Sequence, residues 1–228
     1  MKRILLATGF LFVLLAMGCS TANTKSTQNK WKPYYRIQAG INKGGVVENT
    51  DLAAIPNTQV DAYSGATRNG ANIGARIILP VKRNAIETGV DYMFNSQSFT
   101  YHDAANGFNG ERKLNVSQIM VPVTYSIGVF RKNHAEGLVQ LKFGYVAQFN
   151  IFGVTNVAGN TPSYKTKPFS NGATAGLSTT PFRLKNGAKL GFYFEGYRGS
   201  RAYEDFYNMP EFEMPATAFM KYGIIYQF

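Results

Sequence analysis

Seven charged side chains occur at alternate positions within segments that are otherwise rich in apolar residues. On each segment they fall on the face opposite the apolar side chains: Arg36, Arg76, Glu87, Asp91, Lys142, Glu195 and Lys221. Charges removed from water must be paired to be tolerated. Four cations and three anions on facing surfaces therefore predict a mutually paired polar network that fills a narrow interior. An anion-selective channel is the alternative that this near-balance leaves open.

The two histidines are the other candidates for chemistry. His102 precedes Asp103 in one predicted connection, and His134 lies in another. A membrane-embedded lipid A deacylase would need a His and a Ser near each other on one strand, and the sequence supplies no such pair. The run 101–103 offers too few ligands for zinc. We therefore expect no catalytic residues, no bound metal and no cofactor.

Four carboxylates gather in the last predicted connection: Glu204, Asp205, Glu211 and Glu213. Hard cations prefer such oxygen ligands, but the spacing matches no calcium motif. Arg198 and Arg201 are close enough in sequence to pair with them. We interpret this segment as a solvated loop.

The elements that must position these side chains are β-strands, because apolar and polar residues alternate with a period of two. The pattern predicts eight strands, over 34–41, 70–79, 85–100, 113–129, 137–152, 172–182, 189–198 and 218–228. The segment 137–152 has the clearest alternation, and 172–182 is ambiguous as to which face is apolar. Pro122 falls inside a predicted strand, where its missing N–H predicts a bulge.

The connections between these strands alternate between long and short. The long ones are 42–69, 101–112, 153–171 and 199–217. Transmembrane β-barrels show this alternation because their periplasmic turns are tight and their external loops are long. The sequence therefore predicts an all-β fold over 34–228: an eight-stranded antiparallel up-and-down transmembrane β-barrel with both termini in the periplasm. Eight strands leave an interior only wide enough for side chains.

The N-terminus has the pattern of an export signal. Lys2 and Arg3 precede an apolar stretch over 4–16 that is shorter than the roughly 20 residues of a transmembrane helix. We predict a signal peptide over 1–18 and a polar periplasmic tether over 19–33. The run 15–19, Leu-Ala-Met-Gly-Cys, resembles a bacterial lipobox, although Ala16 stands where leucine is usual. This resemblance implies lipid attachment at Cys19, and an ordinary leader with an incidental cysteine is the alternative.

The formal net charge of +11 raises the question of acidic partners. The basic residues form no single block, and an exported protein rarely meets nucleic acid, so we expect no nucleic-acid partner. Outer-membrane lipids, the phosphates of lipopolysaccharide and acidic glycans are the expected counter-charges.

Two short motifs resemble those of known proteins. The chain ends in Phe228 with Tyr226 two residues before it, which resembles the β-signal read by the barrel-assembly machinery. The segment 119–125, with its internal proline, and the later run 144–147, Gly-Tyr-Val-Ala, resemble the central hairpin of the PorT-like outer-membrane β-barrel family. That resemblance implies an eight-stranded barrel of the bacterial outer membrane, usually of unassigned function.

Three functions are compatible with these features. The first is a non-enzymatic outer-membrane barrel that acts through its external loops in adhesion, ligand binding or assembly of a surface complex, with an unknown extracellular partner. The second is a small-solute channel. The third is a soluble lipocalin-like lipoprotein that holds an apolar ligand, for which the apolar faces would point inward.

Overall fold

The computed structural model describes residues 32–47, 59–62, 69–81, 84–103, 107–129, 139–161, 165–202, 204 and 216–228. The chain divides into two units, Met1–Lys30 and Trp31–Phe228, and the described residues all belong to the second. The predicted leader over 1–18 and all but the last two residues of the predicted tether lie outside them. No helix in the described ranges is long and apolar enough to cross a membrane.

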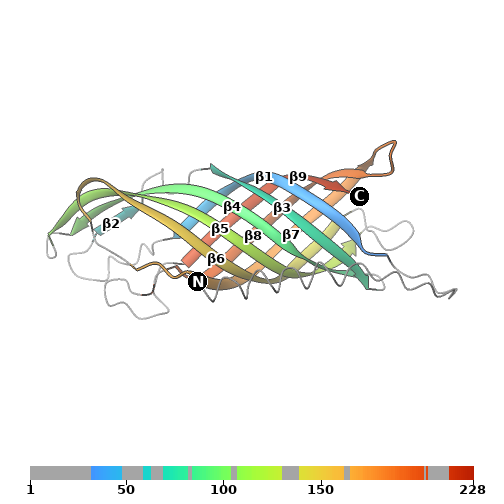
Figure 1. Ribbon diagram of the computed structural model, residues 1–228, viewed down its shortest axis with the longest axis horizontal. Helices are drawn as coiled ribbons and strands as arrows, with labels where there is room; N and C mark the ends of the chain where they lie inside the picture. The colour runs from blue at the N-terminus through green and yellow to red at the C-terminus, as the bar shows by residue number, and fades with distance from the viewer. Residues whose placement is uncertain are drawn as a thin grey trace, which may run out of the picture. The chain divides into compact units, whose positions relative to one another are not determined.

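The described part of the chain forms nine β-strands. They are β1 (Tyr34–Val47), β2 (Gln59–Ala62), β3 (Asn69–Val81), β4 (Asn84–Asp103), β5 (Phe108–Val129), β6 (Val139–Asn160), β7 (Phe169–Arg183), β8 (Lys189–Arg201) and β9 (Ala216–Gln227). All pairings are antiparallel. Eight strands close a ring in the order β4-β3-β1-β9-β8-β7-β6-β5, and β2 adds to β4 (Figure 1). The fold is an eight-stranded antiparallel barrel, as the sequence predicts.

The ring closes with a stagger. A path that follows paired residues from Tyr34 on β1 through Ile78, Glu87 and the remaining strands returns to β1 at Gly44. Such a shift in register requires the strands to tilt relative to the barrel axis. The strands cross the view diagonally for this reason (Figure 1).

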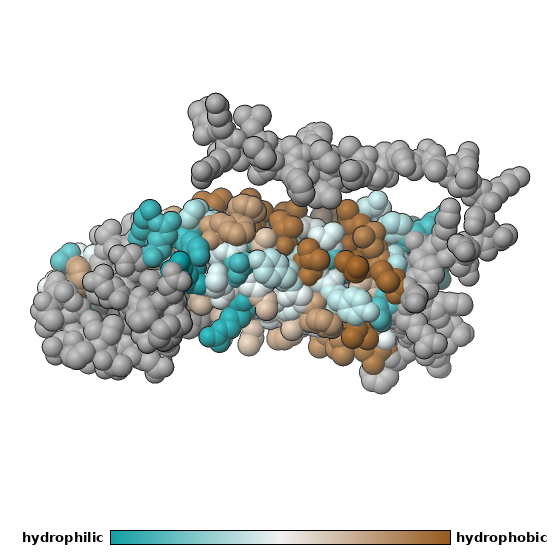
Figure 2. Space-filling model, turned by 90° about the horizontal axis from the view of Figure 1, so that it is seen from below, coloured by the Kyte–Doolittle hydropathy of each residue, from teal (hydrophilic) through white to brown (hydrophobic). Residues whose placement is uncertain are grey.

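Large apolar side chains cover the outer face of the barrel. Ile73, Val123 and Ile224 each expose more than half of their surface, and the residues that flank them in sequence point inward or lie half-buried. Figure 2 shows apolar residues along the middle of one side and hydrophilic residues toward the end that carries β2. The strand period of two thus separates an apolar exterior from a polar interior.

Several strands are longer than the sequence pattern predicts, so part of the predicted loops is sheet. β4 and β5 continue as a hairpin to the pair Asp103 and Phe108, and β6 extends to Asn160. The pairing of β3 with β4 ends at Phe94, and the pairing of β6 with β7 ends at Phe149. Beyond the closed ring there therefore stands a four-stranded extension, β2-β4-β5-β6, which we call the projecting sheet (Figure 1).

In β5 the apolar face changes from the outer side to the inner side where the projecting sheet begins. Within the ring part of β5, Gln118 points inward and Ile119 outward. Farther along, Leu114 and Val116 are buried while Ser117 lies on the outer face. The β4–β5 register continues unchanged through this point. The predicted strand over 113–129 crosses this point, and the backbone ladder continues beyond its predicted end to Phe108.

The bulge predicted at Pro122 is wrong. Pro122 pairs with Val146 on β6, and the ladder to β4 passes from Val123 to Met120 with the register unchanged. The missing N–H leaves a gap of two pairs in one ladder, and every residue beyond it keeps its partner. Register shifts occur elsewhere, between Glu111 and Arg112, Thr179 and Phe182, and Arg198 and Arg201.

Candidate functional site

The candidate site is the group of charged side chains inside the barrel. All seven residues singled out from the sequence pattern are almost completely buried, and none is more than 5% exposed. They come from six strands: β1, β3, β4, β6, β8 and β9. Because each occupies an inward position of its strand, tertiary closure of the ring brings together residues that are far apart in sequence.

Glu87 is the centre of the group nearest the chain termini. Lys142 Nζ lies 2.8 Å from Glu87 Oε2, and Arg36 Nη1 lies 3.4 Å from Oε1. The hydroxyl of Ser126 also donates a hydrogen bond to Glu87, at 2.8 Å. The Arg36 guanidinium donates further hydrogen bonds to the side-chain carbonyls of Gln140 and Gln227, at 3.0 and 3.3 Å.

Asp91 and Glu195 form a second group with two shared cations. Arg76 lies 2.5 Å from Asp91 and 3.5 Å from Glu195. Lys221 lies 2.9 Å from Asp91 and 3.0 Å from Glu195. Lys142 connects the two groups, since its Nζ is also 3.8 Å from Glu195.

The seven side chains therefore form one connected network, which we call the ionic network. Every carboxylate in it faces at least two cations, which compensates the large cost of removing charge from water. Removing one member would leave others buried without a partner. The network links strands that are not neighbours in the ring, so its first effect is to brace the barrel across its interior.

A hydrogen-bonded layer of neutral side chains follows the ionic network toward the projecting sheet. Asn72 donates to the hydroxyl of Tyr193, and Asn95 donates to Asn42 at 2.8 Å. Gln118 donates to Asn150, also at 2.8 Å.

Inward-facing apolar side chains form the next layer. This apolar cluster comprises Val46, Met93, Phe99, Leu114, Val116, Met120, Val146, Tyr197, Ala202 and Phe219. A pattern of one apolar face per strand does not reveal this cluster. The local signal was the inversion in β5, where Leu114 and Val116 alternate with polar residues in the opposite phase.

The two C-terminal aromatic residues lie at the seam where the ring closes. The backbone N–H and C=O of Phe228 both bond to Tyr35 on β1, at 3.0 and 3.1 Å. The rings of Phe228 and Tyr35 stack with centroids 6.1 Å apart, and the ring centroids of Tyr226 and Phe228 are 5.9 Å apart. Phe228 remains 58% exposed on the outer side.

The remaining sequence candidates are not brought together into a site. His102 is exposed on β4 and pairs with Gln59 and Asn109. Glu204 forms an ion pair with Lys165. Cys19, His134 and three acidic residues of the last connection lie outside the described residues: Asp205, Glu211 and Glu213. In the ranges that the structure describes, no three His, Cys, Asp or Glu side chains are grouped so that they could hold a metal ion.

Comparisons with known proteins yield a distant structural likeness. No protein-family model matches the chain, and no curated protein matches it. Among solved structures, the chain is similar to Ail, the attachment invasion locus protein of Yersinia pestis, in complex with the heparin analogue sucrose octasulfate. The identity is 13%, the match covers 86% of this chain and 99% of Ail, and the TM-score is 0.47.

Proposed function

We propose that the barrel spans a bacterial outer membrane and acts without catalysis, as a surface-binding protein that presents its projecting sheet to the exterior. The observation that carries this proposal is the continuity of β4, β5 and β6 from the ring into the projecting sheet. In the ring these strands expose apolar side chains such as Val123 and Phe143. Beyond it the outer positions of β4 and β5 carry polar residues such as Ser96 and Asn115, while β6 keeps Ile151 exposed. An apolar belt that ends where a polar extension begins matches a strand that leaves the bilayer for water.

The arrangement of the interior disfavours the two alternatives. A solute channel needs an open path, whereas the ionic network and the apolar cluster fill successive levels of this interior. A lipocalin-like protein would turn its apolar faces inward around a ligand. Here Ile73, Val123 and Ile224 point outward, and Arg36 and Glu87 point inward. We therefore assign the barrel to the membrane and the binding function to the projecting sheet.

Outer-membrane lipids, lipopolysaccharide and the barrel-assembly machinery are the partners that this placement requires. The N-terminus would be periplasmic, because Tyr34 and Phe228 lie at the end opposite the projecting sheet. A lipid on Cys19 would add a second attachment to the same membrane.

The membrane placement can be tested with two matched tryptophans in a Trp31→Phe background. Phe194 points outward and is 43% exposed, while Phe219 points inward and is 3% exposed. In vesicles of lipids with brominated acyl chains, fluorescence of Phe194→Trp should be strongly quenched and that of Phe219→Trp should not. Absence of quenching at both positions, in a protein that still folds, would refute the membrane barrel.

The binding role can be tested by shortening the β4–β5 hairpin. Removing residues 99–103 and 108–112 leaves Ser98 paired with Lys113 as the last pair before the connection. Cells that display each protein are compared for retention on glass coated with extracellular-matrix protein. A polyanionic probe would be unsuitable, because the removed residues include two acidic and one basic side chain. We expect the shortened protein to assemble, as judged by heat-modified mobility in gels, but to lose retention. Equal retention of both proteins would exclude the projecting sheet as the binding element.

A further inference from the structure

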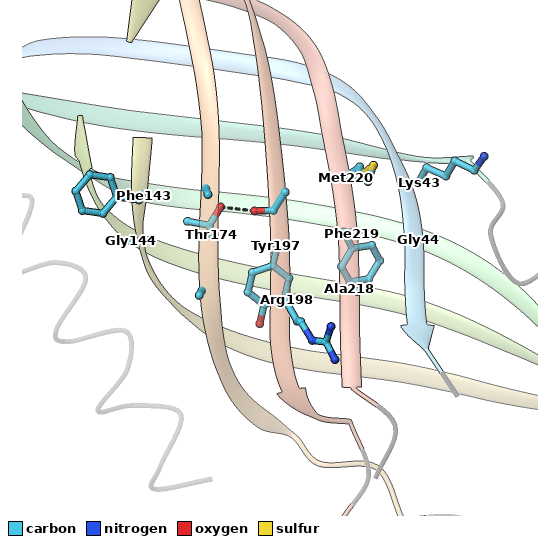
Figure 3. A pocket seen from close by; sticks show the side chains of 13 residues that line it. Lys43, Gly44, Phe143, Gly144, Thr174, Tyr197, Arg198, Ala218, Phe219 and Met220 are labelled. Carbon is cyan, nitrogen blue, oxygen red and sulfur yellow. Dashed lines mark hydrogen bonds between the residues drawn. The ribbon is translucent and has the colours of Figure 1, made fainter. Parts of the chain in front are cut away.

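Part of the barrel's outer face is not covered by large side chains. Across four adjacent strands, one row of paired residues reads Phe143, Ala175, Gly196 and Met220. The two central positions carry at most a methyl group, so a groove runs over β7 and β8 between an aromatic wall and a thioether wall (Figure 3). Ala173 and Ala218 extend its floor toward the projecting sheet. The walls are three strand spacings apart, about 14 Å.

Gly196 marks the open centre of this groove. A Cβ added there would meet no atom closer than 3.8 Å, whereas a Cβ at Gly144, which points inward, would lie 2.2 Å from a backbone oxygen. The backbone under the groove is fixed from the other side, because the Thr174 hydroxyl donates a hydrogen bond of 2.9 Å to the carbonyl of Gly196 (Figure 3). The groove is therefore a fixed feature of the wall, with space for an occupant.

Two cations border the groove, Arg198 at the end nearer the projecting sheet and Lys43 on β1 beyond the Met220 wall. Arg198 follows Gly196 by two positions on β8, and Lys43 pairs with Met220 across the β1–β9 ladder. Both side chains are exposed, and neither forms an ion pair with a carboxylate in the described part of the chain. They differ in this from the four cations of the ionic network, all of which are paired.

We propose that this groove binds an acyl chain of lipopolysaccharide, with a lipid A phosphate held between Arg198 and Lys43. The inference rests on the proposed membrane placement, which puts the groove in the external leaflet and the two cations at its surface. An apolar floor bordered by two cations fits a phosphorylated, acylated lipid. Guanidinium and ammonium groups both bind phosphate, arginine in the bidentate geometry. A second copy of the chain fits less well, because a symmetric contact would bring two Arg198 and two Lys43 side chains together.

The test measures lipid retained by the purified protein, with native mass spectrometry after incubation with bisphosphorylated lipid A. Gly196→Leu should fill the groove, and Arg198→Gln with Lys43→Gln should remove the phosphate contacts. The double glutamine variant should lower retention by about tenfold or more, the change expected from losing one charge-assisted hydrogen bond. Gly196→Leu should lower retention by excluding the acyl chain from the groove. Matched controls place the same leucine side chain at Ala75→Leu, on the outer face of β3, or remove an exposed charge at Lys185→Gln. Neither control should change retention.

Three further outcomes decide the assignment. Phosphatidylglycerol, which carries one phosphate, should be retained less than lipid A, and equal retention would overturn lipopolysaccharide as the occupant. Unchanged lipid A retention in both groove variants would also overturn it, and so would a change from dimer to monomer in Gly196→Leu without loss of lipid. The brominated-lipid experiment separates the two proposals. If the fluorescence of Phe194→Trp is quenched but the protein retains no lipid A, the membrane placement stands and only lipid A binding in the groove is refuted.

Discussion

Lys221 on β9 and Asp91 on β4 form an ion pair across the interior of the barrel, with 2.9 Å between Nζ and Oδ2. Their strands are not neighbours, because β3 and β1 stand between them in the ring. The pair therefore connects parts of the wall that no backbone ladder connects, and it forms only when the ring is closed. The stability of the barrel should depend on it accordingly.

Asp91→Asn should destabilise the barrel strongly. The change preserves the side chain's size but leaves Arg76 and Lys221 with Glu195 as their only carboxylate partner. Breaking a buried ion pair by removing one partner costs about 3–5 kcal/mol. Denaturant unfolding in detergent should show the loss, and adding Lys221→Met should recover part of it. Lys185→Gln, at an exposed turn position, serves as the control. An unchanged unfolding midpoint for Asp91→Asn would contradict the role of the ionic network.

Gln140 should accept a negative charge better than a positive one. Its side-chain carbonyl accepts hydrogen bonds from Arg36 at 3.0 Å and from Ser178 at 3.3 Å. Gln140→Glu would provide a fourth carboxylate for the four cations and should leave stability unchanged or raise it. Gln140→Arg would place a cation against Arg36 and should cost about 3 kcal/mol. The same denaturant assay measures both. The opposite order of midpoints would show that the network is not electrostatically organised.

Phe228→Ala should slow assembly without removing any backbone hydrogen bond. The alanine variant keeps the two bonds to Tyr35 but loses the stacked ring. If the terminal aromatic residue is part of the assembly signal, periplasmic precursor should accumulate in pulse–chase experiments. Phe228→Trp should assemble normally. Equal assembly rates for the alanine variant and the wild type would count against a signal at Phe228.

Cys19→Ala tests the lipid attachment separately from the barrel. If Cys19 is acylated, the variant should lose metabolic labelling with fatty acid. The barrel should still fractionate with outer membranes, because its apolar outer face contributes far more than acyl chains do. Wild-type protein without label would refute lipid attachment and leave the barrel unaffected.

Epitope insertions at two turns test the orientation. Gly107 and Gly187 both have positive φ, 69° and 86°, and both have open space around the Cβ position. They lie at opposite ends of the barrel, Gly107 before β5 and Gly187 before β8. On intact cells, antibody should reach a tag at Gly107 and not one at Gly187. The reverse result would invert the proposed orientation.

Alternation in the sequence predicts the ring well, because a strand with lipid or solvent on one side and a packed interior on the other repeats every two residues. All eight strand centres and the inward direction of residues such as Arg36 and Lys142 follow from it. The ion-pair partners of these side chains do not follow from alternation. Which carboxylate faces Lys142 depends on the stagger of the closed ring, and no local pattern records that quantity.

The predicted strands over 85–100, 113–129 and 137–152 enter the projecting sheet but end short of its tip at Asp103, Phe108 and Asn160. In β5 the apolar face changes from the outside at Ile119 to the inside at Val116, so one strand carries two patterns of opposite phase. The part that was missed lies beyond this change: residues 109–112, Asn-Gly-Glu-Arg, show no alternation of apolar and polar side chains. β2 was missed because four residues are too few to show a period.

The unbroken register of β4 and β5 through that junction has a mechanical consequence. No change in register separates the tip of the hairpin from the wall of the barrel. A force applied to the tip is therefore distributed over many backbone hydrogen bonds of the β4–β5 ladder. A partner that binds such a sheet also orders little that was free beforehand, which lowers the entropic cost of binding. In the proposed membrane placement, the molecule would act as a rigid arm that holds a partner at a fixed distance and angle from the cell surface.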